Sequence, residues 1–233
     1  MRCEHEHDDG AYVLGALSPA ERAAYERHLA TCSFCREAVS KTLQAFGHLD
    51  ILINNASAIS LTTIEKTSQK AYALMQDINV KGTFFVSQAC VPYLKQATNA
   101  HILTLSPPIN MDEKWFASHL AYTISKYNMT MIAMGLSGEL KDERIASNTL
   151  WPRTTIATAA IRNLPGGERL MQMSRTPEIV ADAAFFILKR PSAQCTGNSF
   201  KDEEVLMQEG ITDFTKYYAF PEGEGRLFTD LFL

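Results

Sequence analysis

The chain has 233 residues, of which 46% are hydrophobic and 21% are charged. This composition predicts a globular protein with a full core, as one large domain or two unequal ones. A net charge of -4 offers no basic surface for direct contact with nucleic acid or an anionic membrane. No apolar run approaches the roughly 18 residues that a membrane helix needs, so we expect a cytoplasmic protein.

The first forty residues differ from the rest of the chain in their density of His, Cys, Ala and Glu. A capping box at 18–21 predicts a helix from Pro19 to about Ala30. His28 falls in the last turn of that helix, and Cys32 and Cys35 follow it. One imidazole and two thiols at such close spacing predict a structural zinc site.

The fourth zinc ligand comes from upstream, where Cys3, His5 and His7 are available. The segment, including the run 9–17 and the H-x3-C-x2-C pattern, resembles the zinc-binding anti-sigma factor domain. That resemblance favours Cys3 and then His7, and it implies a sigma factor as the partner of residues 1–40. The alternative is that His28, Cys32 and Cys35 are ordinary residues of an amphipathic helix pair.

After residue 41, short apolar runs alternate with capped helical segments. Glycine at 47 predicts the end of a helix, and further helices are expected at 69–78, 80–97, 118–139 and 176–189, with short ones at 156–163 and 168–173. Strands are expected at 50–54, 101–105, 145–150 and 198–201. This alternation predicts an α/β fold with a partial doubly wound parallel sheet. Residues 202–233 carry no clear pattern.

Tyr122 and Lys126 are four residues apart in the long predicted helix, so both side chains project from one face. A tyrosine titrates near about 10 and is a weak acid-base group at neutral pH unless a nearby cation stabilises its phenolate. Lys126 is placed to supply that charge. The pair suits proton transfer to or from an alcohol or carbonyl oxygen. The alternative is an exposed helical pair without function.

Five short patterns occur in one order and give the chain a family resemblance. They are Asn54-Asn55-Ala56, the segment 77–80, Ser106, Tyr122-x3-Lys126 and the segment 151–154. Residues 41–233 thereby resemble the short-chain dehydrogenase/reductase family.

The resemblance implies an NAD(P) cofactor, a small carbonyl or alcohol substrate and a role for each matching residue. Tyr122 would be the general acid or base, Lys126 would lower its pKa and hold the nicotinamide ribose, and Asn79 would bind a relay water. The implied cofactor-binding residues are Asn55, Ala56, Lys126, Pro152, Ile156 and Thr158. These positions suit the carboxyl ends of parallel strands, where open sheets bind ligands.

Two departures from the family pattern stand out. Ser106 lies sixteen residues before Tyr122, whereas the family's substrate-orienting serine lies thirteen before it, so Ser106 is either that serine or a turn cap. No G-x-x-x-G-x-G turn, which would receive the pyrophosphate, occurs among the twelve glycines. We therefore expect impaired cofactor binding and an uncovered edge on the strand at 50–54.

Three functional hypotheses follow from a division into a zinc module at 1–40 and a truncated dehydrogenase domain at 41–233. The chain is an oxidoreductase, or a zinc-dependent regulator whose dehydrogenase part is a scaffold or dimerising body, or a fusion of two gene fragments. Zinc content and NADPH affinity distinguish these hypotheses.

Overall fold

The computed structural model describes residues 33–220 and 227–233. In this part of the chain four parallel strands form one sheet in the order β1-β2-β3-β4. The bounds are β1 (Ile51–Asn54), β2 (His101–Leu105), β3 (Ala146–Trp151) and β4 (Ser199–Lys201). The predicted parallel sheet is confirmed, and each strand begins and ends within one residue of its expected position.

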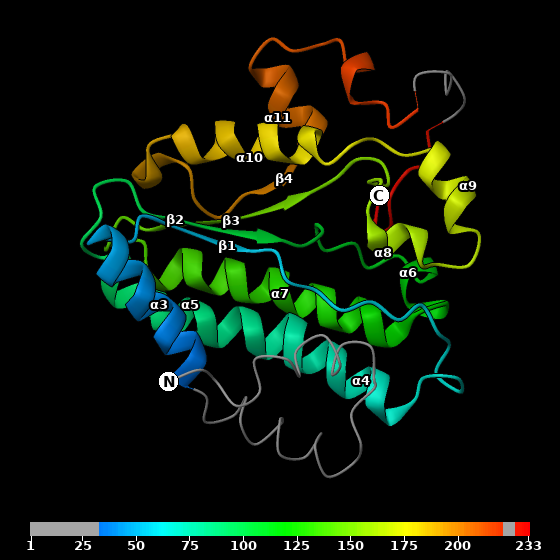
Figure 1. Cartoon of the computed structure of the whole chain (residues 1–233), viewed down its shortest axis with the longest axis horizontal. Coiled ribbons are helices and arrows are strands. Elements are labelled where there is room, and N and C mark those ends of the chain that lie inside the picture. Colours follow the sequence, from blue (N-terminus) through cyan, green and yellow to red (C-terminus); the bar gives the residue numbers. More distant parts are fainter. Residues whose placement is uncertain (1–32, 221–226) are drawn as a thin grey trace.

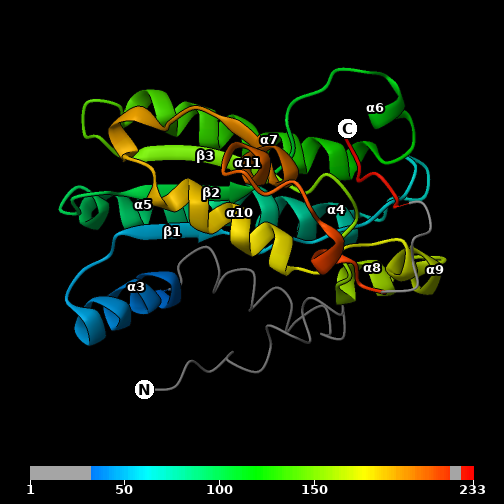
Figure 2. The ribbon, with the colours of Figure 1, turned by 90° about the horizontal axis from the view of Figure 1, so that it is seen from above.

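Helices cover both faces of the sheet, with α5 and α7 on one face and α10 and α11 on the other (Figures 1 and 2). In the described residues no helix is long and apolar enough to cross a lipid bilayer. The bounds are α3 (Ser33–Phe46), α4 (Gln69–Met75), η1 (Gln76–Gly82), α5 (Thr83–Leu94), α6 (Lys114–Ala117), α7 (Leu120–Glu139), α8 (Ala159–Arg162), α9 (Gly167–Gln172), α10 (Glu178–Lys189), η2 (Ser192–Gln194), α11 (Asp202–Gln208) and η3 (Thr215–Tyr217).

The end of α3 follows the predicted glycine signal. Gly47 has a φ of +79°, and its N–H donates to the carbonyl of Leu43 at 2.7 Å, which satisfies a carbonyl of the last turn. Helix α3 itself runs through residues 40 and 41, where the sequence predicts a domain boundary.

The two helices expected at 69–78 and 80–97 are joined in the structure without a break. The π-helical segment η1 connects α4 to α5. No glycine or proline lies between Gln69 and Lys81, so the sequence has no residue there that would end a helix. The wider π-helical turn of η1 keeps the backbone hydrogen-bonded from α4 into α5. Asn79 lies in this wide turn and is fully buried, so the segment has a role in the site described below.

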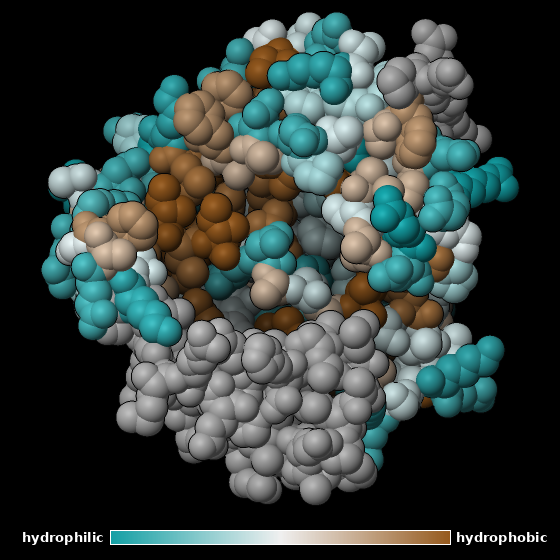
Figure 3. Space-filling view, viewed as in Figure 1, coloured by the Kyte–Doolittle hydropathy of each residue, from teal (hydrophilic) through white to brown (hydrophobic). Residues whose placement is uncertain are grey.

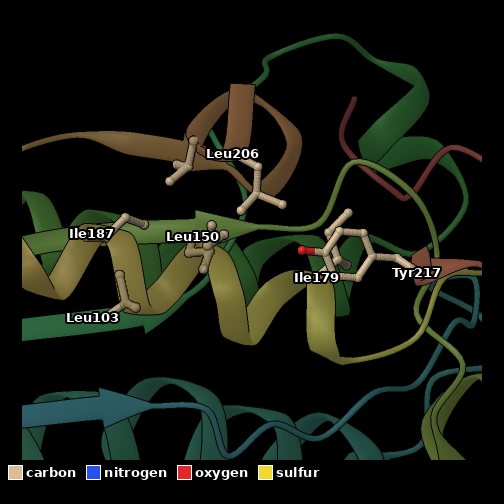
Figure 4. Packing of buried hydrophobic residues seen from close by; sticks show 8 residues of the cluster. Leu103, Leu150, Ile179, Ile187, Leu206 and Tyr217 are labelled. Atoms are coloured by element: carbon tan, nitrogen blue, oxygen red, sulfur yellow. The ribbon is translucent and has the colours of Figure 1, made fainter. Parts of the chain in front are cut away.

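The core on one face of the sheet joins β2 and β3 to α10 and α11. Leu103 and Leu150 project from the strands toward Ile179, Ile187 and Leu206 (Figure 4). These strands are buried on both faces, which is why the sequence shows them as continuous apolar runs. Helix α11 lies within residues 202–233, where the sequence predicted no secondary structure.

Strand β1 is an edge of the described sheet, since its backbone pairs with β2 and with no other strand in the described ranges. Ile51 and Ile53 are 40% and 46% exposed, and Phe185 of α10 is exposed as well. Apolar side chains gather on the face where β1 and α10 lie (Figure 3). The expected uncovered edge is therefore present in the described part of the chain.

Candidate active site

Helix α7 carries Tyr122 and Lys126 one turn apart, on the face that packs toward the sheet. Their side chains are 5% and 2% exposed. The interpretation of an exposed helical pair is therefore wrong, because the sheet and the surrounding loops enclose both groups.

The ammonium of Lys126 lies where three parallel strands end. Its Nζ donates to the carbonyl of Leu105 at 2.7 Å, at the end of β2, and to the hydroxyl of Ser57 at 3.4 Å, in the loop after β1. It also lies 5.1 Å from the ring centre of Trp151, the last residue of β3. A cation at the carboxyl edge of a parallel sheet occupies the usual ligand-binding position of this architecture.

Burial governs the pKa values of both groups in this conformation. It raises the pKa of the Tyr122 phenol, and the carboxylate of Asp230 acts in the same direction. Burial lowers the pKa of Lys126 to about 7, although Asp230 opposes that shift. The lowering of the Tyr122 pKa by Lys126 stays a prediction, because in this conformation burial dominates the pKa of both groups and disfavours their charged forms.

Asn79 is tied to the loop after β1 and to α7. Its Oδ1 accepts from the N–H of Ala58 at 2.7 Å, and its Nδ2 donates to the carbonyl of Ala58 at 2.9 Å and to the hydroxyl of Ser125 at 2.9 Å. Both amide hydrogens are thereby engaged. A relay water, as predicted, could therefore bind only to the second lone pair of Oδ1 or to backbone atoms of Asn79.

Ser106 follows β2, as predicted, but it is fully buried beneath α7. Its hydroxyl accepts a hydrogen bond from Thr130 at 2.9 Å, and the hydroxyl of Thr130 also lies 2.6 Å from the carbonyl of Pro107. Contact with a substrate carbonyl would require Ser106 to be uncovered, so its orienting role stays a prediction.

The expected cofactor-binding residues lie on two segments near Lys126. Asn55 and Ala56 are exposed just after β1. In the loop after β3, Pro152 is buried while Ile156 and Thr158 are half-buried.

These residues fit the nicotinamide half of a dinucleotide better than its pyrophosphate half. The hydroxyl of Thr154, in the loop after β3, is buried and has no hydrogen-bond partner among the described residues, so a polar ligand group could take it. By the family resemblance, this loop would contact the nicotinamide half, and the exposed segment after β1 would contact the adenine ribose. The pyrophosphate half has no glycine-rich turn in the described ranges.

The predicted zinc site lies largely outside the described residues. This applies to Cys3, His28 and Cys32, and Cys35 is described only as part of the backbone of α3. Within residues 33–220 and 227–233, no group of three or more His, Cys, Asp or Glu side chains could hold a metal ion.

Sequence reasoning missed several residues that surround the pair. Ser57 contacts Lys126, and Phe232 packs against Tyr122 with ring centres 6.1 Å apart. Asp230 interacts electrostatically with both members of the pair. Ser57 directly follows the Asn-Asn-Ala pattern and could have been considered, whereas nothing in the sequence connects residues 230 and 232 to the site.

Comparison with known proteins agrees with this architecture. A sequence profile of the short chain dehydrogenase family matches residues 6–166. Hydroxysteroid dehydrogenase-like protein 2 of Xenopus laevis is 52% identical over 184 residues, which are 79% of this chain and 43% of that protein. The chain thus spans less than half the length of the curated relatives that it matches.

Two solved structures extend the similarity to the fold. A candidate dehydrogenase from Xanthomonas campestris superposes with a TM-score of 0.81 at 46% identity, covering 85% of this chain and 72% of the other. A short chain dehydrogenase from Mycobacterium thermoresistibile gives a TM-score of 0.78 at 49% identity, with coverages of 85% and 70%. The profile match and these two structures show that the chain belongs to the short chain dehydrogenase family.

Proposed function

We propose that the chain is an NAD(P)-linked oxidoreductase that reduces a small carbonyl compound or oxidises the corresponding secondary alcohol. The observation that carries this proposal is the position of Tyr122 and Lys126, which share one face of α7 at the carboxyl ends of β1, β2 and β3. An acid-base group and a cation enclosed at that edge suit proton transfer to a carbonyl oxygen.

In the reductive direction Tyr122 would donate its phenolic proton to the substrate oxygen. When NAD(P)H is bound, its nicotinamide supplies the hydride. Lys126 would hold the ribose hydroxyls and, once charged, stabilise the phenolate that proton donation leaves behind. The carbonyl of Leu105 and the hydroxyl of Ser57 orient the ammonium for that task.

Asn55, Ala56, Pro152, Ile156 and Thr158 would bind the cofactor beside this pair. We propose that the affinity is weak, because the chain contains no glycine-rich turn to present backbone N–H groups to the pyrophosphate. Loss of that turn removes contacts to the phosphates and leaves the contacts of Lys126 in place. Turnover is therefore expected only at high cofactor concentration.

The test measures NADPH consumption with 2-tetralone, a bicyclic ketone with one flat aromatic ring, at millimolar NADPH. Tyr122→Phe should lower the rate by about a hundredfold or more, the usual contribution of a positioned general acid. Tyr72→Phe is the matched control, since Tyr72 is exposed on α4, and it should keep the wild-type rate. A wild-type chain without turnover, or equal rates in the two variants, would refute the proposal.

The spacing of His28, Cys32 and Cys35 supports a second candidate, a zinc-dependent regulator that contacts a sigma factor through residues 1–40. In that case the dehydrogenase domain serves as a scaffold or as a surface for homo-oligomer formation. Zinc analysis of the purified chain separates the two. Near-stoichiometric zinc without NADPH binding favours the regulator, and absence of zinc excludes it.

A further inference from the structure

Residues 227–233 form a strap that packs against the candidate active site. The strap lies beside the loop after β3, with an antiparallel bridge between Thr154 and Thr229. The N–H of Asp230 donates to the carbonyl of Arg153 at 3.2 Å, and the indole N–H of Trp151 donates to the carbonyl of Leu231 at 2.9 Å. Figures 1 and 2 show this C-terminal segment near α6, at the end of the sheet that carries the site.

The strap inserts one aromatic side chain beside the catalytic candidate. Phe232 is 1% exposed, and its ring centre lies 6.1 Å from that of Tyr122. Four more aromatic rings lie around Phe232 and form, with Tyr122, an aromatic pocket. Their ring centres are 5.2 to 6.1 Å from that of Phe232, and they belong to Trp115, His119, Tyr127 and Trp151. A buried ring packed against five others leaves no space for another molecule in the pocket.

The same strap places a carboxyl group near the lysine. Asp230 and Lys126 interact electrostatically, and burial brings the pKa of each to about 7, raising that of the acid and lowering that of the base. A lysine whose pKa is lowered in this way carries less positive charge near neutral pH, which weakens its stabilisation of a phenolate. The closed conformation is therefore poorly suited to proton transfer at Tyr122.

We propose that residues 227–233 are an autoinhibitory strap, in which the Phe232 ring occupies the place of a flat apolar group of the substrate and must leave before substrate binds. This inference rests on the proposed function, because it assigns the aromatic pocket to the substrate of that reaction. It also specifies the substrate class: a carbonyl compound whose apolar ring fits between aromatic side chains.

Population arithmetic gives the expected effect of removing the ring. If the pocket is free only in the fraction of molecules with an open strap, the apparent dissociation constant exceeds the intrinsic one by the reciprocal of that fraction. For a strap that is open in about one molecule in ten or fewer, Phe232→Ala should bind 2-tetralone at least about tenfold more tightly than the wild type. Phe228→Ala is the matched control, since Phe228 belongs to the same strap but is 45% exposed, and its affinity should not change.

Tryptophan fluorescence reports this binding directly. The chain has two tryptophans, Trp115 and Trp151, and both rings pack against Phe232. Quenching by 2-tetralone gives the dissociation constants without requiring turnover. Equal affinities in the wild type and Phe232→Ala would overturn the proposal.

A second measurement uses the wild-type chain and does not depend on the folding of a variant. Saturating 2-tetralone should increase amide hydrogen exchange within residues 227–233, because the displaced strap loses its hydrogen bonds. Unchanged or slower exchange there would mean that the strap is a fixed wall of the site, and the proposal would be wrong. Tighter binding by Phe232→Ala without any turnover would instead refute the proposed activity and leave the strap supported.

Discussion

Replacing Asn79 with alanine tests whether the π-helical turn holds the site together. The asparagine side chain satisfies both backbone groups of Ala58 and also donates to the hydroxyl of Ser125. All three residues are buried. Alanine cannot replace any of these bonds, so the loop after β1 would lose the link to α7 that runs through Asn79.

The structure gives the size of the expected loss. Ser125 keeps its hydrogen bond to the carbonyl of Tyr122, so two groups of Ala58 are left without partners. Each buried unsatisfied group costs about 1–3 kcal/mol, which gives a loss of roughly 4 kcal/mol in the free energy of unfolding. At roughly 2–4 °C per kcal/mol for a chain of this length, the melting temperature should fall by about 8–16 °C.

Equilibrium urea denaturation measures the free energy directly, provided that the slope of the transition is unchanged. Asn163→Ala is the control, because Asn163 is exposed at the end of α8 and its loss should change the stability by less than about 0.5 kcal/mol. A loss below about 1 kcal/mol for Asn79→Ala, at equal slope, would refute the reasoning. It would show that other groups or water satisfy the backbone of Ala58.

Two further predictions follow from the structure. Burial raises the pKa of Asp230 to about 7, so the folded chain keeps a proton there that the unfolded chain releases above about pH 4. Stability should therefore fall between about pH 4 and pH 7, by at most about 1.4 kcal/mol per pH unit, and Asp230→Asn should remove this contribution from urea midpoints measured across that range. Gly167→Ala should destabilise the region of α8 and α9, because a Cβ there would lie 2.2 Å from the carbonyl oxygen of Arg162. Gly138→Ala meets nothing within 4 Å inside α7 and should stabilise by about 0.5–1 kcal/mol, so equal melting temperatures for the two variants would contradict this assignment.

The sequence by itself determined the framework of the described domain. Strands β2 and β3 could be predicted because central parallel strands are buried on both faces and appear as continuous apolar runs. The end of α3 followed from Gly47, and the spacing of Tyr122 and Lys126 put them on one face of α7. These are local rules, and they depend only on residues close together in the chain.

Only the tertiary structure decided the state of the site. The fold brings Asp230 and Phe232 to Tyr122 from more than a hundred positions along the chain, and no local pattern marks that contact. The pKa of Lys126 likewise follows from its burial, which the four-residue spacing to Tyr122 does not reveal. Desolvation depends on everything that packs around a charge, so it is determined by long-range packing and not by the neighbouring sequence.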